Sequence, residues 1–524
     1  MRAVRSFHPS GEKFSLLASI EKAIPRLEVH NLTKCFGSLV ANDGISLTVL
    51  PGELHCLLGE NGAGKSTLSS CLYGLSQPDA GEILIDGTTV ELRTPADAIK
   101  AGVGMVHQHF VLVPTFTVLE NIVVGTGRSW RLDISAARRR IEELCGRFGL
   151  ELAPDRLVSQ LSVGEKQWVE IVKALYLGAR LLILDEPTAV LTPQESQRLF
   201  AIIDQLKAAG ISVILITHKM NEVMRSDRVS VLRKGRLVAT VETSKVSRDD
   251  LTLMMVGRMV KPVEARNSAR DGTIALSIRG LTLGISRSHY LPTIDLDLAR
   301  GEILGLAGVA GNGQDELLEV IAGLAKPQAG TITLRGDDIG TMTAYEIATR
   351  GVGYVPSDRF RDGLVPDFTI AENLILGRHW DRQWMRGPFL DRTAITQRGD
   401  EAISAYSIAA ANPRMPCDRL SGGNAQKVIL AREIGKARHL LLCNQPTRGV
   451  DVGAIEFIHG ELLAKRATGC AIVLVSEEID DLLALSDRIA VMFRGEIMGV
   501  FQRGTADIAT IGRLMAGHRD SVQS

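Results

Sequence analysis

The chain has 524 residues, of which 45% are hydrophobic, and its 60 basic and 60 acidic side chains give no formal net charge. This length suggests roughly two to four domains, and the charge balance argues against a generally basic nucleic-acid binder. Seven scattered cysteines without a CxxC pair argue against a disulfide framework and a zinc site, and favour buried thiols in a reducing compartment.

The first half of the chain alternates between strand-like and helix-like segments. Short aliphatic runs indicate buried strands, and longer amphipathic stretches such as 196–210 indicate helices between them. Segments rich in turn residues indicate antiparallel strands near the start. The expected antiparallel strands are 26–36, 43–52 and 81–90, and the expected buried strands are 53–58, 181–185 and 212–217. This alternation predicts an α/β fold with a parallel sheet core and an antiparallel β part.

The second half repeats the first. GLAGVAGNGQ at 305–314 resembles CLLGENGAGK at 56–65, and LLLCNQPT at 440–447 resembles LLILDEPT at 181–188. A repeat this long indicates a duplicated domain rather than a solenoid. We expect an N-terminal extension, a first domain, a polar linker and a second domain, at 1–25, 26–258, 259–272 and 273–516. No long apolar run suggests a signal peptide or a membrane span, so we expect a cytoplasmic protein that reaches a membrane only through a partner.

GENGAGKST at 59–67 fits the phosphate-binding pattern G-x-x-x-x-G-K-[ST], and it lies between a predicted strand and a predicted helix. Glycines allow the backbone N–H groups to approach phosphate oxygens, Lys65 supplies positive charge, and Ser66 supplies a hydroxyl to Mg²⁺. The alternative is a chance glycine-rich turn. The residues expected to surround the phosphates are Gly59, Glu60, Asn61, Gly62, Ala63, Gly64, Lys65, Ser66 and Thr67.

The strand LLILD at 181–185 supplies two acids that complement this loop. Asp185 is placed to join the Mg²⁺ site, and Glu186 is placed to act as general base toward the attacking water. The alternative is a strand that ends in a solvated acidic turn. The phosphate-binding loop upstream favours the catalytic interpretation.

The segments LSVGEKQ at 161–167 and LSGGNAQ at 420–426 indicate which class of P-loop protein this chain resembles. With the phosphate-binding loop, the DEP strand and a terminal TH in that order, both units resemble the ATP-binding cassette ATPases. The resemblance implies P-loop domains with an added helical subdomain, which use ATP and Mg²⁺. It also implies that Ser421, Gly422 and Gly423 cap the γ-phosphate held by the other unit, with the two cassettes pairing within one chain.

Three further roles follow from this resemblance. Gln108, in MVHQHF, matches the glutamine that senses Mg²⁺ and contacts the membrane partner; His218 matches the switch histidine at the γ-phosphate; Phe36 matches the aromatic that stacks on adenine. Taken alone, such a histidine is more often an ordinary surface residue, and such a phenylalanine more often belongs to the core.

The second unit departs from the pattern at most functional positions. The substituted residues are Gln314, Asp315, Ser357, Asn444, Gln445 and Glu477. The first unit has Val163 in its LSVGE segment, whereas the second keeps a complete LSGG, and Thr192 stands where most cassettes have the aspartate that the second copy retains as Asp451. The pattern therefore predicts hydrolysis at one composite site, formed by the first phosphate-binding loop and the second LSGG segment.

At length the chain resembles the ATPase subunits of bacterial importers for simple sugars and nucleosides. That resemblance implies separate membrane permeases, an extracytoplasmic solute-binding protein, a location on the inner face of the membrane, and no nucleic-acid partner. One alternative is a soluble tandem cassette acting on ribosomes or nucleic acid, for which the basic and aromatic stretch 377–389 offers stacking residues. The other is an ATP-binding module without turnover, against which Glu186 and His218 count.

Overall fold

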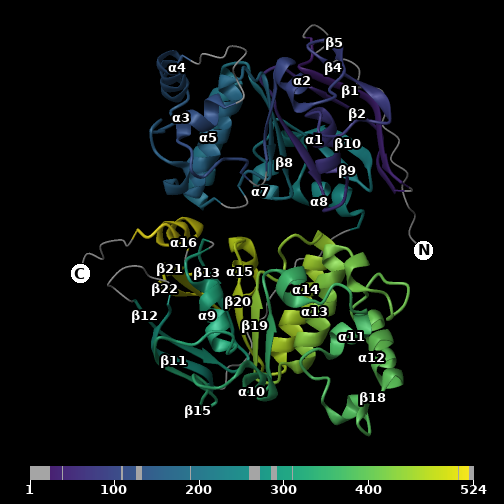
Figure 1. The fold of residues 1–524 in the computed structure, drawn as a ribbon, viewed down its shortest axis with the longest axis vertical. Helices are drawn as coiled ribbons and strands as arrows, with labels where there is room; N and C mark the ends of the chain where they lie inside the picture. The colour runs from purple at the N-terminus through teal and green to yellow at the C-terminus, as the bar shows by residue number, and fades with distance from the viewer. Residues whose placement is uncertain are drawn as a thin grey trace. The chain divides into compact units, whose positions relative to one another are not determined.

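The computed structural model describes residues 24–37, 39–107, 110–124, 133–188, 191–258, 272–284, 292–309, 311–505 and 507–518. These residues form two compact units, one within Met1–Ala189 and Gln197–Met259, the other within Val190–Ser196 and Val260–Ser524. Each unit combines a mainly parallel sheet, a small antiparallel sheet and a group of helices (Figure 1). The predicted α/β class with repeated units is confirmed.

The central sheet of the first unit has the strand order β10-β9-β3-β8-β7-β6. Its strands are β3 (Leu54–Gly59), β6 (Val103–Val106), β7 (Leu181–Asp185), β8 (Ser212–Thr217), β9 (Arg228–Arg233) and β10 (Arg236–Glu242). All neighbours pair in parallel except β9 and β10. The inner strands are buried almost throughout because helices cover both faces, which explains their continuous aliphatic sequences.

The antiparallel sheet of the first unit has the order β2-β1-β4-β5. Its strands are β1 (Leu27–Phe36), β2 (Leu39–Val49), β4 (Ala80–Ile85) and β5 (Thr88–Val90). The predicted antiparallel pairing is confirmed, although β2 begins before the expected segment 43–52 and ends earlier. This sheet shares one hydrophobic core with β3 and the helix that follows it, so it is packed firmly beside the phosphate-binding loop.

The helices of the first unit are α1 (Lys65–Leu72), α2 (Pro95–Lys100), α3 (Val118–Val123), α4 (Ile134–Arg147), α5 (Val163–Tyr176), α6 (Pro193–Ala208), α7 (Met220–Val223) and α8 (Arg248–Val256). Helices α3, α4 and α5 pack on one another and form the helical part that the family resemblance implied (Figure 1). Within the described ranges, no helix is both long enough and apolar enough to cross a bilayer.

The second unit repeats this architecture. Its central sheet has the order β16-β19-β20-β13-β21-β22, its antiparallel sheet the order β12-β11-β14-β15, and β17 and β18 form a separate hairpin. The strands are β11 (Ile274–Thr282), β12 (Thr293–Ala299), β13 (Ile303–Ala307), β14 (Ala329–Leu334), β15 (Asp337–Asp338), β16 (Val352–Val355), β17 (Met385–Arg386), β18 (Phe389–Leu390), β19 (Leu440–Asn444), β20 (Ala471–Val475), β21 (Arg488–Phe493) and β22 (Glu496–Gln502). The helices are α9 (Gln314–Ile321), α10 (Ala344–Thr349), α11 (Ile370–Ile375), α12 (Arg392–Ala405), α13 (Gly422–Lys436), α14 (Val452–Ala467), α15 (Ile479–Leu485) and α16 (Ile508–Met515).

The cysteines are all free thiols, six of them buried and Cys35 half-buried. Cys56 and Cys443, for example, lie inside the central strands β3 and β19. The absence of disulfide bonds agrees with the scattered spacing. The large buried cores that pack against the sheets stabilise the units without crosslinks.

Candidate functional site

The phosphate-binding loop joins the end of β3 to the start of α1. Gly62 and Gly64 have positive φ angles of 79° and 102°, which a side chain would strain. A Cβ atom on Gly64 would lie 2.5 Å from the carbonyl oxygen of Ala41, so the loop also needs a glycine for space. The loop therefore turns tightly enough to bring its N–H groups to the N-terminus of α1, where anions are favoured.

Lys65, the first residue of α1, extends into the loop. Its side chain is only 6% exposed, and Nζ donates hydrogen bonds to the carbonyl oxygens of Gly59 (2.7 Å) and Glu60 (3.0 Å). Burial lowers the pKa of Lys65, and this is opposed by the negative charges of Glu186 and Asp185. The lysine thus lies where phosphate oxygens would replace the loop carbonyls as its partners.

Asp185 ends β7 and lies close enough to Lys65 to interact with it electrostatically. Burial, and then the neighbouring charge of Glu186, raise the pKa of Asp185 to about 6. Among the described residues, no cluster of three His, Cys, Asp or Glu side chains forms a metal site. One carboxylate with the hydroxyl of Ser66 nevertheless suits Mg²⁺, which usually takes one or two carboxylates and completes its shell with phosphate oxygens and water. The donor set at this loop fits the expected metal.

Glu186 and His218 are brought together although they are 32 residues apart. His218 Nδ1 lies 3.0 Å from Glu186 Oε1, and this hydrogen bond is the largest cause of the lowered pKa of Glu186. Glu186 has φ of +46°, a conformation that non-glycine residues rarely adopt, and its N–H donates to the carbonyl of Ile216 (2.9 Å). This left-handed conformation lies directly after the C-terminal end of β7, and no sequence pattern indicated it.

Phe36 lies at the end of β1 and is 53% exposed, with the Lys34 ammonium 5.5 Å from its ring centre. It is a surface ring rather than a core residue, so the position is compatible with stacking on a base. Gln108 lies outside the described residues.

The two LS segments differ in how they begin their helices. Ser162 caps α5 in a capping box: its Oγ accepts from the Glu165 N–H (3.2 Å), and the Glu165 carboxylate accepts from the Ser162 N–H (2.7 Å). Ser421 makes no such cap on α13; its Oγ instead accepts a hydrogen bond from Asn424 Nδ2 (2.8 Å). The first helix N-terminus is already closed by a carboxylate, whereas the second, at Gly422 and Gly423, begins without one.

The second unit places its substituted residues at the same points of the fold. Gln314 starts α9, is 4% exposed, and its Nε2 donates to the carbonyl of Val309 (3.3 Å). Asn444 Nδ2 donates a hydrogen bond to Asp315 Oδ1 at 2.8 Å. Asn444 stands at the position of Asp185 and Asp315 at the position of Ser66, so this bond directly connects the two positions that would hold the metal. A metal at this point would have to break that bond.

In the second unit, the pair formed by Glu186 and His218 in the first unit is replaced by a contact that involves the neutral side chain of Gln445. Gln445 repeats the left-handed conformation of Glu186, with φ of +50°, and its N–H donates to the carbonyl of Val475 (2.9 Å). Gln445 Oε1 accepts from the backbone N–H of Glu477 (3.1 Å). The backbone shape of the first unit is preserved while its ionised base is lost.

Thr192 and Asp451 each cap the N-terminus of the helix that follows, although one is a hydroxyl side chain and the other a carboxylate. Thr192 forms a capping box with Glu195 before α6, and Asp451 accepts from the Ala454 N–H (2.8 Å) at the start of α14. The departure at Thr192 therefore leaves the local helix start intact.

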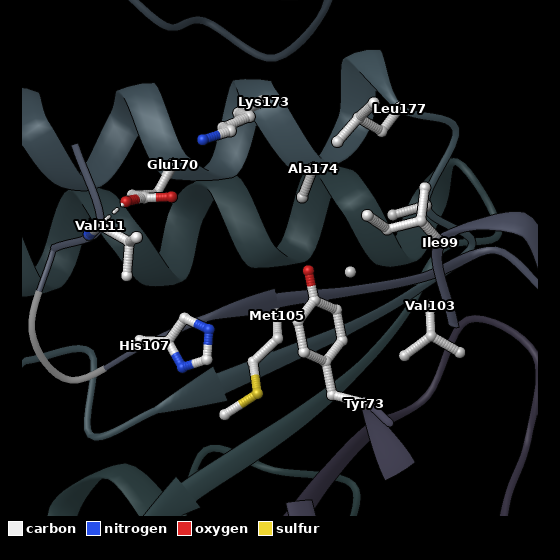
Figure 2. Close-up of a pocket in the computed structure, with 12 residues that line it drawn as sticks. Tyr73, Ile99, Val103, Met105, His107, Val111, Glu170, Lys173, Ala174 and Leu177 are labelled. Atoms are coloured by element: carbon white, nitrogen blue, oxygen red, sulfur yellow. Dashed lines mark hydrogen bonds between the residues drawn. The ribbon is translucent and has the colours of Figure 1, made fainter. Parts of the chain in front are cut away.

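Each unit also has a cavity between its central sheet and its helical part. In the first unit the cavity measures about 120 Å³ and lies between α5 and the edge strand β6. Figure 2 shows Glu170 and Ala174 of α5 across this cavity from Tyr73 and Met105. Glu170 accepts from the Val111 N–H (2.9 Å), and burial raises its pKa. No sequence pattern indicated this cavity, because its lining comes from separate segments.

The corresponding cavity of the second unit is larger and more highly charged. It measures about 460 Å³, and Asp315, Ser357 and Asn444 line it together with Arg361 and Arg432. Ser357, the substitute for the predicted glutamine, therefore borders the altered metal position of its own unit.

This arrangement, a buried lysine in a glycine loop with a nearby Asp-Glu strand end and a histidine, defines a P-loop nucleotide hydrolase. A family model described as ABC transporter matches residues 42–189 and 291–448. The chain belongs to this family, as a protein with two ATP-binding cassettes, and the predicted family is confirmed. Cassettes of this family bind ATP, and the chain is accordingly an ATPase.

Relatives of known name align over nearly the whole chain. The Nucleoside import ATP-binding protein NupA of Lactococcus lactis is 43% identical over 495 residues, covering 94% of this chain and 98% of the relative. The Guanosine import ATP-binding protein NupO of Bacillus subtilis is also 43% identical, covering 94% and 97%. The Ribose import ATP-binding protein RbsA 1 of Rubrobacter xylanophilus is 40% identical, covering 94% and 97%.

Proposed function

We propose that this chain is the ATP-hydrolysing subunit of an importer that takes up a nucleoside or a simple sugar. The similarity to nucleoside, guanosine and ribose import proteins over more than nine-tenths of the chain supports this. Separate membrane permeases carry the solute, an extracytoplasmic solute-binding protein delivers it, and the ATPase works on the inner face of the membrane. The soluble ribosome-directed alternative has less support, because the similar proteins above are all named for import.

One composite site performs the hydrolysis. It combines Lys65, Glu186 and His218 of the first unit with Ser421 and the start of α13 from the second. The observation that carries this proposal is the asymmetry of the two units: the first has an ionised base held by a histidine, whereas the second has its metal positions bonded to each other. The open α13 N-terminus and the acid-capped α5 N-terminus support the same division.

The chemistry follows from the positions of the side chains. Lys65 exchanges its bonds to the loop carbonyls for bonds to phosphate oxygens, which its positive charge stabilises. Ser66 and Asp185 would hold Mg²⁺, which supplies charge neutralisation at the phosphates when bound. Glu186 orients the attacking water and accepts its proton, and His218 fixes the Glu186 carboxylate and keeps it ionised.

Phe36, Gln108 and the cavities complete the proposal. Phe36 stacks on adenine with its exposed face. Gln108 lies next in sequence to His107, which lines the cavity of the first unit, and the permease docks there and at the corresponding cavity of the second unit. ATP binding closes the cassettes and hydrolysis reopens them, and this cycle drives the permease between its two states.

Two measurements test the proposal. The purified chain should hydrolyse ATP, and a tagged chain in its native host should co-purify with membrane permeases. Co-purification with ribosomes instead would support the alternative function, and ATP binding without hydrolysis would support the module without turnover. Binding of nucleosides and of pentoses and hexoses by the solute-binding protein of the same complex then identifies the solute.

A further inference from the structure

The connection between α11 and α12 in the second unit forms a folded surface that nucleotide chemistry does not use. It runs from Leu376 to Asp391, 16 residues, whereas the connection between α3 and α4 in the first unit, from Val124 to Asp133, has 10. The added length contains the hairpin of β17 and β18, next to α12 in the helical part of the unit (Figure 1). This is the basic and aromatic stretch noted in the sequence.

Internal contacts hold the hairpin in place. Trp384 packs against the buried cluster of Ala371, Ile375 and Ile395 on the adjacent helices. The backbone N–H of Asp391 donates to the Trp384 carbonyl (2.8 Å), which ties the end of the hairpin to its beginning. The side chains that the hairpin exposes are therefore presented on a fixed support.

The hairpin exposes large apolar side chains beside arginines. Phe389 is 75% exposed and Leu390 is 46% exposed, and Phe389 pairs across the hairpin with Arg386. Arg382 and Arg386 are both exposed. Opposite residues of an antiparallel pair project from the same face, so an arginine and an aromatic ring share one side of the hairpin tip. Exposed apolar residues next to basic ones suit an interface that is apolar below and negatively charged at its surface.

A second exposed aromatic group connects this region to the cavity of the unit. Trp380 is 40% exposed and packs edge-to-face on Tyr345, with 4.7 Å between the ring centres. Tyr345 belongs to α10, whose residues Ala344 and Ile347 line the charged cavity. The exposed aromatic residues therefore border the cavity at which the permease is proposed to dock.

We propose that the surface made by Tyr345, Trp380, Arg382, Arg386, Phe389 and Leu390, here termed the hairpin surface, binds the anionic headgroup region of the membrane. The proposal rests on the proposed function, because the docking place of the permease is what brings this surface close to the bilayer. The arginines pair with lipid phosphates, and Phe389 and Leu390 enter the boundary between headgroups and acyl chains. The charge of the surface favours anionic over zwitterionic lipid.

The test measures co-sedimentation of the full chain with vesicles. Vesicles of phosphatidylcholine with about one-third phosphatidylglycerol should bind the chain, and vesicles of phosphatidylcholine alone should not. Since a basic residue near such a surface contributes roughly fivefold in affinity, the double variant Arg382→Glu with Arg386→Glu should bind at least about 25-fold more weakly. Phe389→Ser with Leu390→Ser should also weaken binding, and added salt should weaken binding of the parent.

A charge-matched control separates the hairpin surface from overall charge. Arg139→Glu with Arg248→Glu changes the net charge equally at exposed positions of the first unit, and this variant should bind like the parent. Equal vesicle binding by the hairpin variants and the parent, or no binding by the parent, would overturn the proposal. Binding of single-stranded RNA in place of vesicles would overturn it too and assign the surface to nucleic acid.

The ATPase rate of each variant is measured without vesicles. It should equal that of the parent, because the hairpin surface contains no residue of the composite site. A parent without ATPase activity would refute the proposed function, whereas the vesicle experiment would still decide the role of the hairpin surface.

Discussion

Protonation of a single carboxyl group should limit metal binding at the first phosphate-binding loop. Burial and the adjacent Glu186 raise the pKa of Asp185 from its ordinary value of 3.8 to about 6. Mg²⁺ requires the carboxylate form, so protons compete with the metal below this pKa. We expect the metal affinity of the nucleotide-loaded chain to be nearly constant above pH 7 and to fall about tenfold per pH unit well below pH 6.

The variant Glu186→Gln tests the cause of this shift. Removing the neighbouring negative charge should lower the pKa of Asp185 and move the midpoint of metal binding to lower pH, while the larger effect of burial remains. The assay is titration of Mn²⁺ into the chain with a non-hydrolysable ATP analogue between pH 5 and pH 8, followed by electron paramagnetic resonance. The nucleotide phosphate also titrates near pH 6, so the difference between parent and variant isolates Asp185. A variant midpoint equal to or above that of the parent would refute the reasoning.

Other substitutions separate the roles of matched residues in the two units. Asn444→Asp places a second carboxylate against Asp315, 2.8 Å away in the present bond, and should destabilise the second unit by about 1–3 kcal/mol at neutral pH; thermal denaturation should show the loss, and adding Asp315→Ser should reverse it. Ser162→Ala removes the cap of α5 and should lower stability by about 1 kcal/mol while ATPase activity is retained. Ser421→Ala should do the reverse, lowering the ATPase rate with little change in melting temperature, because Ser421 does not cap α13. Equal effects of the two serine substitutions on activity would contradict the assigned roles.

The sequence predicted the features that short segments encode. The phosphate-binding loop was recognisable because its glycines, its lysine and the flanking strand and helix are contiguous. The strand β7 was recognisable because four aliphatic residues in a row, followed by Asp185, are typical of a buried strand with a polar end. The helix predicted after the loop begins at Lys65 and ends at Leu72. Strand and helix ends depend on hydrogen bonds to distant segments, which local patterns do not encode.

Local sequence patterns could not predict the contacts between distant segments. The bond between Asp315 and Asn444 joins residues 129 positions apart, and no local rule relates an acid on a helix to an amide at a strand end. The left-handed conformation of Glu186 and Gln445 likewise depends on the adjacent strands β8 and β20, which hold each backbone N–H. Both features follow from sheet topology rather than from residue preference.

One missed feature had a readable signal. The S-x-x-E spacing from Ser162 to Glu165 is typical of a capping box, and it predicts that this serine closes its own helix. Ser421 is followed three residues later by Asn424 instead, so this spacing alone distinguishes the two LS segments.

The central claim is that ATP hydrolysis by this chain depends on a single general base, Glu186. The most direct test is the steady-state ATPase rate of two variants at equivalent positions, Glu186→Gln and Gln445→Ala, with nucleotide binding measured in parallel. We predict that Glu186→Gln lowers the rate by roughly a hundredfold or more while nucleotide binding persists, and that Gln445→Ala stays near the parent rate. Equal losses in the two variants, or substantial turnover by Glu186→Gln, would contradict the claim.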